Sequence, residues 1–306
     1  MGRSASRVGD EVLCDEHPSA MGRVTAGSGN VNEAQRPVSR FGDPALCRGE
    51  RLLSITPHAS FATEGSATVL INGRPAVRHG DRVAPGGSTL FGADMVFIGG
   101  PLVGLPSNLS VEGSDSFKQE VFAQLGLIAG TRSGQRLFAD LQGASPRTVR
   151  IVEHDPERYP GKATFVDDDT GDARPVMRGK GGDGRVEYYP RMASEGQLDH
   201  AEFQPGTAGD DAVLFHELMH ARGHLHAHRY PKSELTPEEY RELTGQDGSL
   251  FRGKDHGYES HCQDEVTGNW HDCGEPRAAG LYPYEDSDLS ENPYRRERGY
   301  VPRTFY

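Results

Sequence analysis

Two histidines separated by three residues are the strongest chemical signal in the chain. They lie in the segment His216-Glu217-Leu218-Met219-His220. Residues four apart on a helix share one face, so the two imidazoles can bind the same zinc ion. Glu217, between them, is then placed to act as the general base that activates a water molecule. The spacing therefore predicts a zinc-dependent hydrolytic centre with His216 and His220 as ligands.

The residues around this segment predict the helix that the spacing requires. Asp210 precedes the apolar run 212–215, and Asp is favourable at the start of a helix. Pro231 follows after Gly223 and marks the end of the helical pattern. Two incidental histidines on a surface helix are the alternative, but Glu217 would then be buried among apolar residues without a partner. We therefore favour a catalytic helix.

The zinc ion needs a third protein ligand, and the residues leave alternatives. His226 completes the spacing His-Glu-x-x-His-x-x-Gly-x-x-His, which is that of the metzincin peptidases. Those enzymes also require a methionine turn farther along the chain, whereas the last methionine here is Met219. A downstream acid is the competing candidate, and the segment 261–268 offers Asp264 and Glu265.

Length and composition bound the class of protein. A chain of 306 residues is longer than most single domains, so two domains are expected. Hydrophobic residues make up 35% of the chain, and 39 Gly and 20 Pro indicate many loops. The net charge of -12, without a long basic run, argues against binding to nucleic acid or to an anionic membrane. Partners are therefore expected to be proteins.

The start of the chain is polar and lacks the apolar core of an export signal. No apolar segment of about 18 residues, the minimum for a membrane helix, occurs anywhere. We therefore expect no Sec signal peptide, so that export would use another route.

Residues 1–100 contain an internal repeat. Segments of a first copy align with segments of a second, and in both copies an Arg-Pro segment is followed by Gly-Asp. The aligned pairs are 8–14 with 41–47, 27–31 with 65–69, and 36–40 with 74–78. Residues 92–98 form a third, truncated copy. Short β-branched runs separated by Gly-Asp and Asn-Gly turns indicate stacked β-hairpins.

This segment resembles the PAAR-repeat family, named for Pro-Ala-Ala-Arg, which is here Pro75-Ala76-Val77-Arg78. Members form small, pointed β-cones that cap the trimeric VgrG spike of bacterial type VI secretion systems and hold a zinc ion near the tip. The resemblance implies an all-β hairpin cone over residues 1–100 and a VgrG trimer as partner. It also implies a protein that stays in the bacterial cytoplasm before firing and is then secreted into a target cell.

Four residues of the two copies could bind that structural zinc ion. Cys14 and His17 of the first copy occupy places equivalent to Cys47 and His58 of the second. Two thiolates and two imidazoles suit a tetrahedral zinc site, which would stabilise an apex too small for a hydrophobic core. His79 is a competing donor, and reduced thiols without a metal are the alternative.

Residues 101–114 contain Pro, Gly and Ser and lack periodicity, so we predict a linker there and a second domain over 115–306. Apolar periodicity and β-branched runs predict two helices and a strand, at 117–127, 133–141 and 148–152. Another strand, at 185–189, is expected to be an edge strand that receives an extended substrate.

The second domain resembles the NleD-type effector peptidases and, more distantly, the clostridial neurotoxin light chains. Both groups carry a His-Glu-Leu-x-His-Ala segment, an acidic pair followed by Thr and Gly, a glutamate, and a C-terminal Arg-x-x-Tyr. In this chain the set is 216–221, 264–268, Glu291 and 303–306. The resemblance implies an α+β zincin-like metallopeptidase domain.

The resemblance also implies roles for single residues. The zinc ligands would be His216, His220 and Glu265, with Glu217 as the base. Arg303 and Tyr306 would stabilise the oxyanion, and Glu291 would orient Arg303. The segment after the acidic pair is shorter than in the relatives, which keeps Asp264, and more remotely Glu259, as substitutes for Glu265.

Two further cysteines lie in the second domain. Cys262 and Cys273 are close in sequence, so a disulfide that clips a loop, or two free thiols, is favoured. A second zinc site with His261 and His271 is the weaker alternative.

These observations predict a type VI secretion effector, in which a spike tip carries a zinc endopeptidase that cleaves a protein of the target cell. An immunity protein is a further expected partner if the prey is bacterial, and the sequence does not identify the substrate. One alternative is a non-enzymatic tip protein or adaptor that binds a prey protein. Another is a zinc amidase that acts on peptidoglycan.

Overall fold

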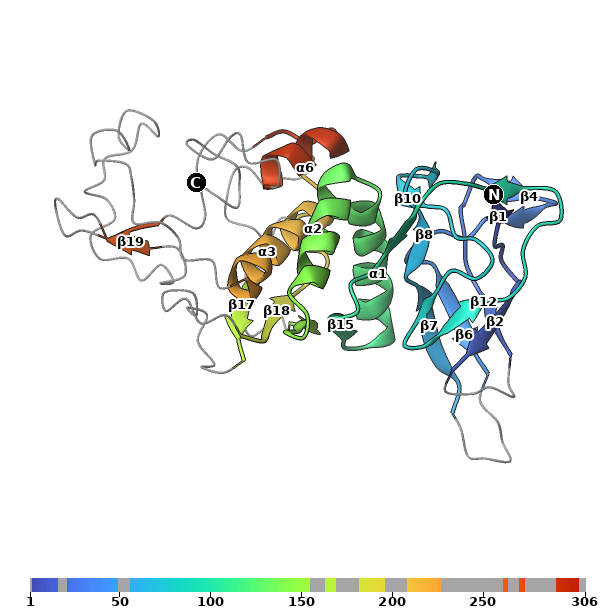
Figure 1. Cartoon of the computed structure of the whole chain (residues 1–306), viewed down its shortest axis with the longest axis horizontal. Helices are drawn as coiled ribbons and strands as arrows, with labels where there is room; N and C mark the ends of the chain where they lie inside the picture. Colours follow the sequence, from blue (N-terminus) through green and yellow to red (C-terminus); the bar gives the residue numbers. More distant parts are fainter. Residues whose placement is uncertain are drawn as a thin grey trace. The chain divides into compact units, whose positions relative to one another are not determined.

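The computed structural model describes residues 2–15, 21–48, 56–154, 163–168, 182–195, 208–226, 261–263, 270–272 and 290–302. The chain forms two compact units (Figure 1). The first combines Met1–Pro106 with Gly113–Phe138, and the second combines Ser107–Glu112 with Ala139–Tyr306. No helix in the described part of the chain is both long and apolar enough to cross a membrane.

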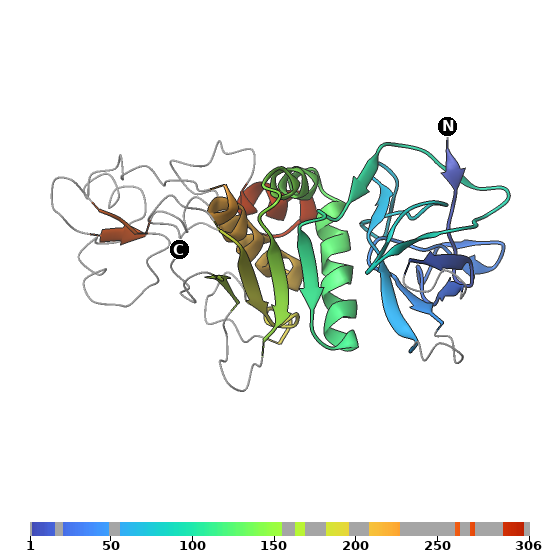
Figure 2. The ribbon, with the colours of Figure 1, turned by 60° about the horizontal axis from the view of Figure 1, so that its bottom comes forward.

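The first unit is built around a nearly closed antiparallel sheet, whose strands run from blue to cyan in Figures 1 and 2. Its strand order is β11-β7-β6-β3-β2-β12, and an isolated bridge between Arg82 and Ser88 joins the two outer strands. The strands are β2 (Glu11–Cys14), β3 (Gly22–Val24), β6 (Pro44–Cys47), β7 (His58–Ala62), β11 (Val83–Ala84) and β12 (Gly87–Thr89). Closure leaves few unpaired edges, as expected for the predicted β-hairpin cone, and the predicted fold class is confirmed.

Four two-stranded ribbons complete the β-structure of this unit. They are β1 (Arg3–Ser4) with β13 (Phe97–Ile98), β4 (Asn32–Glu33) with β5 (Arg36–Pro37), β9 (Leu70–Ile71) with β10 (Arg74–Pro75), and β8 (Glu64–Ser66) with β14 (Leu102–Gly104). All four are antiparallel.

A closed ring of three backbone hydrogen bonds relates three copies of the repeat. The N–H of Ser6 donates to the carbonyl of Val77 (3.0 Å), that of Val77 to Ser39 (3.0 Å), and that of Ser39 to Ser6 (2.8 Å). Each residue therefore donates to one neighbour and accepts from the other. Such a cycle requires three equivalent backbone segments around one axis, so the unit has an internal pseudo-threefold arrangement.

The same Arg-x-Gly-Asp turn follows each residue of the ring. In each turn the arginine N–H donates to the aspartate carboxylate at 2.8 or 2.9 Å, and the guanidinium pairs with the same group. The glycines have φ of +85°, +81° and +80°, a conformation that only glycine adopts without strain. The turns are Arg7–Asp10, Arg40–Asp43 and Arg78–Asp81.

The third copy is assembled from two distant parts of the chain. The sequence predicts residues 92–98 to be a truncated copy, and in the structure β13 pairs with β1 to complete it. The N–H of Ala93 donates to Ala5 (2.7 Å), as Ser28 and Ser66 donate at the matching positions of the other copies. The alignment of 8–14 with 41–47 already matched the turn at Gly9 with the turn at Gly42, but the pairing of β1 with β13 was not predicted.

Helix α1 (Asp115–Ala129) belongs to the first unit and packs against its repeats at very short range. Its N-cap is Ser114, whose hydroxyl accepts from the N–H of Phe117 at 3.3 Å, and its apolar face is buried. The rings of Phe61 and Phe122 stack with centroids 4.7 Å apart. Gly42 lies so close that an added Cβ would sit 2.0 Å from the carbonyl oxygen of Phe122. The backbone of the helix therefore contacts the backbone of the repeat.

The segment predicted to be a linker contains regular structure. Strand β14 lies within 101–114 and pairs in the first unit, whereas β15 (Leu109–Glu112) pairs in the second. Pro, Gly and Ser report turn preference, but three or four residues of strand are too few to show periodicity. The described boundary between the units therefore differs from the predicted one.

The second unit contains a mixed four-stranded sheet in the order β15-β16-β18-β17. Strands β15, β16 (Val149–Glu153) and β18 (Gly184–Tyr188) are parallel, and β17 (Thr164–Asp167) is antiparallel. The prediction that 185–189 is an edge strand is wrong, because β18 pairs on both sides. The alternating burial of the β18 side chains shows which face of the sheet is covered, but it does not show whether neighbouring strands pair with both edges of β18.

The remaining described elements of this unit include the candidate catalytic helix and its neighbour α6. Helices α3 and α6 contact each other, and α3 also packs on β17 and β18 (Figure 1). The elements are α2 (Arg132–Gly143), which spans the boundary of the units, α3 (Asp210–Leu225), β19 (His261–Gln263), β20 (Trp270–Asp272) and α6 (Glu291–Arg298). The predicted helices 117–127 and 133–141 and the strand 148–152 are confirmed.

We expect Gly42→Ala to destabilise the first unit by about 2 to 4 kcal/mol, because the methyl group meets a carbonyl oxygen and the backbone has a positive φ. Chemical denaturation of the full chain measures this. Gly29→Ala is the matched control, since an added Cβ there has no neighbour within 4 Å. Equal unfolding midpoints for the two variants would contradict the close packing of α1.

Candidate metal centres

The predicted catalytic helix is present as α3. Asp210 and Asp211 lie in its first turn, where carboxylates are favourable, and almost all of its residues are buried. The helix packs on β17 and β18 on one side and on α6 on another. Its histidines therefore face the interior of the unit, where a metal site can be shielded from water.

The two imidazoles of the motif converge. The Nε2 atoms of His216 and His220 lie 3.0 Å apart, and the rings meet edge to face with centroids at 4.7 Å. Both side chains are buried, with 4% and 7% of their surface exposed. Two nitrogens that face each other at this distance can be bridged by one cation. The donor set thus fits a zinc ion, as the spacing predicts.

Glu291 contacts the opposite side of His216. One oxygen of this fully buried carboxylate lies 2.8 Å from Nδ1 of His216, and the other accepts from Nε of Arg295 at 2.5 Å. An ionised carboxylate only accepts hydrogen bonds, so Nδ1 of His216 carries a hydrogen, and in a neutral ring the lone pair then lies on Nε2. This is the arrangement by which carboxylates orient metal-binding histidines.

The structure brings some of the predicted catalytic residues together. Glu217 lies on α3 between the two histidines and is 8% exposed. Glu265, with its substitutes Asp264 and Glu259, lies outside the described residues, and so do Arg303 and Tyr306. The role predicted for Glu291 toward Arg303 is therefore not described. The contacts of Glu291 that are described are those with His216 and Arg295.

His226, the metzincin alternative, lies at the C-terminal end of α3 and is exposed. Its Nε2 lies 2.8 Å from the backbone carbonyl oxygen of Asp140. Metal-binding histidines also make such a contact with one ring nitrogen, so the third ligand stays a prediction. Of the two other cysteines, Cys262 lies in β19, and Cys273 lies outside the described residues.

A buried polar cluster beside the histidines was missed in the sequence. The carboxylate of Asp211, which is 3% exposed, accepts from the hydroxyl of Tyr294, from that of Tyr300 (2.8 Å) and from Nε of Arg298 (2.9 Å). Burial and the Asp211 carboxylate raise the pKa of Tyr300 to about 12 and that of Tyr294 well above its usual value. Both phenols are therefore neutral donors.

The helix that supplies these donors carried a readable signal. Ser290 occupies the N-cap of α6, Glu291 lies in its first turn, and Arg295, Arg296 and Arg298 lie in its last. Gly299 ends it in the left-handed conformation, with φ of +74°. Acids at the start, bases at the end and a terminal glycine are typical helix boundaries.

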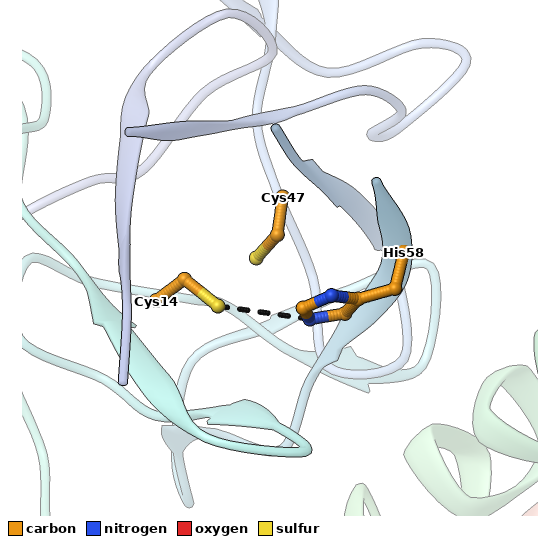
Figure 3. Close-up of side chains that lie close together, drawn as sticks. All are labelled: Cys14, Cys47 and His58. Atoms are coloured by element: carbon orange, nitrogen blue, oxygen red, sulfur yellow. Dashed lines mark hydrogen bonds between the residues drawn. The ribbon is translucent and has the colours of Figure 1, made fainter. Parts of the chain in front are cut away.

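A second cluster lies in the first unit. The ligand atoms of Cys14, Cys47 and His58 all lie within 4.8 Å of one another, and the side chains point toward a common centre (Figure 3). Sγ of Cys14 lies 3.6 Å from Nε2 of His58, and Sγ of Cys47 lies 3.2 Å from the hydroxyl of Ser60. Two thiols and an imidazole suit zinc.

Three of the four predicted ligands of this cluster are thus brought together by β2, β6 and β7. The fourth, His17, lies outside the described residues. His79, the competing donor, is described but does not belong to the group.

Comparison with known proteins supports the division into two functional parts. A family model described as PAAR motif matches residues 15–90, and the peptidase M91 model, described as effector protein, matches residues 106–306. The molecule is therefore a PAAR protein fused to an effector domain. Because the second match spans more than half of the chain, the chain belongs to the peptidase M91 family of effector proteins.

Two curated relatives from Pseudomonas aeruginosa match over 83 residues at 40% identity. They are the NAD(P)(+) glycohydrolase toxin Tse6, from strain PAO1, and the (p)ppApp synthetase toxin Tas1, from strain UCBPP-PA14. Each match covers 26% of this chain and 19% of the relative. The chain thus spans about a fifth of the relatives it matches. Since their named activities differ, the shared residues do not specify the activity.

Removing Glu291 is expected to destabilise the second unit by about 3 to 5 kcal/mol, because it removes the carboxylate that Arg295, 1% exposed, contacts in the interior. Denaturant unfolding of Glu291→Ala measures the loss. Replacing both partners, in Glu291→Ala with Arg295→Met, should recover part of it, since an apolar pair needs no compensating charge. A double variant no more stable than Glu291→Ala would disprove the coupling.

Proposed function

We propose that the chain is a type VI secretion effector in which a spike-tip domain carries a zinc endopeptidase. The effector part is proposed to hydrolyse peptide bonds in a protein of the target cell. The observation that carries the enzymatic part is the convergence of two buried imidazole Nε2 atoms at 3.0 Å, with a carboxylate behind one ring and Glu217 on the same helix. A non-enzymatic adaptor has no need for that arrangement.

In this proposal His216, His220 and Glu265 hold the zinc ion. When bound, zinc supplies a Lewis acid that polarises a carbonyl group and acidifies water. Glu217 takes the proton from the attacking water and passes it to the departing amine. Arg303 and Tyr306 offset the negative charge that develops on the former carbonyl oxygen.

The described contacts of the second unit support a fixed site. Glu291 keeps the hydrogen of His216 on Nδ1, so that its Nε2 is available as a ligand. Arg295 balances the charge of Glu291, which allows His216 to stay neutral. Neutral imidazole is the form that binds metals.

The first unit is proposed to dock on a VgrG trimer. Support comes from its pseudo-threefold arrangement, because a surface that repeats three times around one axis can make equivalent contacts with three subunits. Val31, Val69 and Val96 occupy matching positions in the three copies and are 38%, 37% and 39% exposed. A structural zinc ion bound by Cys14, Cys47 and His58, with His17 as fourth ligand, would stabilise the apex.

We expect Glu217→Gln to reduce proteolysis by about 100- to 10,000-fold while zinc binding is retained, because the amide cannot accept the proton. New protein N-termini in recipient cells, compared between the parent and this variant, identify the activity and the substrate. Glu195→Gln is the matched control, since this partly exposed glutamate pairs with Arg191 on the surface.

Three outcomes distinguish the alternatives. Termini that appear with the parent and with Glu195→Gln, but not with Glu217→Gln, support an endopeptidase. Release of sugar-linked peptides from sacculi without new protein termini would instead support an amidase. Equal toxicity of the parent and Glu217→Gln would point to a non-enzymatic role.

For the first unit, Cys47→Ala is expected to lose one equivalent of zinc and to lower the unfolding midpoint of that unit. The loss of a thiolate removes one of the ligands within 4.8 Å of each other. Elemental analysis of the purified full chain gives the stoichiometry. Ser60→Ala, which removes only the hydroxyl beside Cys47, should keep the metal. Equal zinc content in all three proteins contradicts the assignment.

A further inference from the structure

We infer that Asp211 is a positioning residue of the proposed peptidase, which anchors α6 and the segment after it to the helix that carries the zinc ligands. This inference rests on the proposed function. Asp211 is not proposed to contact the reacting atoms. It acts through α6, which places Glu291 against His216, and through the segment that follows α6 and precedes Arg303 in the sequence.

The anchor is a single carboxylate with three donors. Tyr294 and Arg298 belong to α6, Tyr300 follows that helix, and all three bind Asp211 in the first turn of α3. A carboxylate offers about four acceptor sites on two oxygens, so it can satisfy all three donors. An asparagine has one acceptor oxygen and no charge, so it satisfies fewer of these donors and does not form an ion pair with Arg298. The site therefore favours a charged acceptor over a neutral polar side chain.

The anchor and the histidine contact lie on the same helix. Glu291 at the start of α6 binds His216, and Tyr294, one turn later, binds Asp211. The ring of Tyr294 also stacks on Phe215, the neighbour of His216, with centroids 4.2 Å apart and planes within 5°. A shift of α6 along α3 would therefore break both contacts together. Asp211 sets the position at which Glu291 reaches His216.

The segment after α6 is held by the same network. The N–H of Tyr300 donates to the carbonyl of Arg295 (2.8 Å), and Nη1 of Arg295 donates to that of Val301 (2.8 Å). The hydroxyl of Tyr300 accepts from Nη2 of Arg298 (3.1 Å) while it donates to Asp211. The backbone is thus fixed on both sides of Tyr300. In the sequence, the proposed oxyanion donor Arg303 follows three residues after Tyr300.

The test compares neighbouring aspartates of α3 in the zinc-loaded full chain. Asp211→Asn is expected to lower kcat about 100-fold with little change in KM, because displaced catalytic groups slow the reaction more than they weaken binding. The substrate is a peptide that spans the cleavage site found by mapping termini. The second readout is the release of zinc to a chromophoric chelator. The phase of release that is absent in His216→Ala is assigned to the site on α3, and the variants are compared in that phase. Zinc affinity in that phase should fall about 10- to 100-fold.

Asp210→Asn is the matched control. Asp210 lies in the same turn, but its carboxylate accepts from the backbone N–H groups of Ala193 and Ser194 and not from α6. It should lower the unfolding temperature without changing kcat or zinc release. Tyr300→Phe removes one donor and keeps the ring, so it should show a smaller change of the same kind even if Asp211→Asn does not fold.

The outcomes separate this inference from the proposed function. If the parent cleaves and binds zinc, but Asp211→Asn and Tyr300→Phe change only the unfolding temperature, as Asp210→Asn does, the positioning role is refuted and the peptidase stands. If the parent releases no zinc in the phase assigned to His216 and cleaves nothing, the proposed function fails, and the positioning role fails with it.

Discussion

The buried carboxylate of Glu291 determines the state of the candidate catalytic site. Its two oxygens have two different partners, Nδ1 of His216 and Nε of Arg295. The guanidinium balances the negative charge, so the imidazole can stay neutral while it still donates its Nδ1 hydrogen. A buried carboxylate without the arginine would favour a protonated imidazole, which cannot bind zinc. The ability of His216 to act as a ligand therefore also depends on Arg295, which lies 79 positions away in the sequence.

The first unit is held together differently. Within the repeats, two apolar clusters consist of Val, Ala and Ile, such as Val12, Val24, Ala45 and Val83. Clusters of this size bury little surface, so hydrogen bonds must fix the geometry. The three Arg-x-Gly-Asp turns and the closed ring of backbone bonds do so at equivalent positions. The same geometry that stabilises the unit also produces the threefold arrangement on which the proposed docking depends.

Sequence reasoning succeeded where the signal was local. The histidine spacing identified α3, and the Gly-Asp turns identified the hairpins, because each depends on a few consecutive residues. It failed where distant segments combine. The third copy of the repeat is formed by β13 and β1, and the edge assigned to 185–189 is covered by β17, which the sequence did not predict. The Asp211 cluster was missed for the same reason, since its donors lie more than 80 residues away. Glu265, Arg303 and Tyr306 lie outside the described residues, so their roles stay predictions.

The polar residues buried in α3 are costly unless each one has a partner. Asp211 has three donors, His224 accepts from the N–H of Gly182 at 3.1 Å, and His216 is bound by Glu291. His216 and His220 face each other through their Nε2 atoms. Two such nitrogens can share a single proton, or both can bind one cation. A fold stabilised only by packing would place apolar side chains there. Two imidazoles in this geometry therefore fit the proposed metal ion better than a purely structural role.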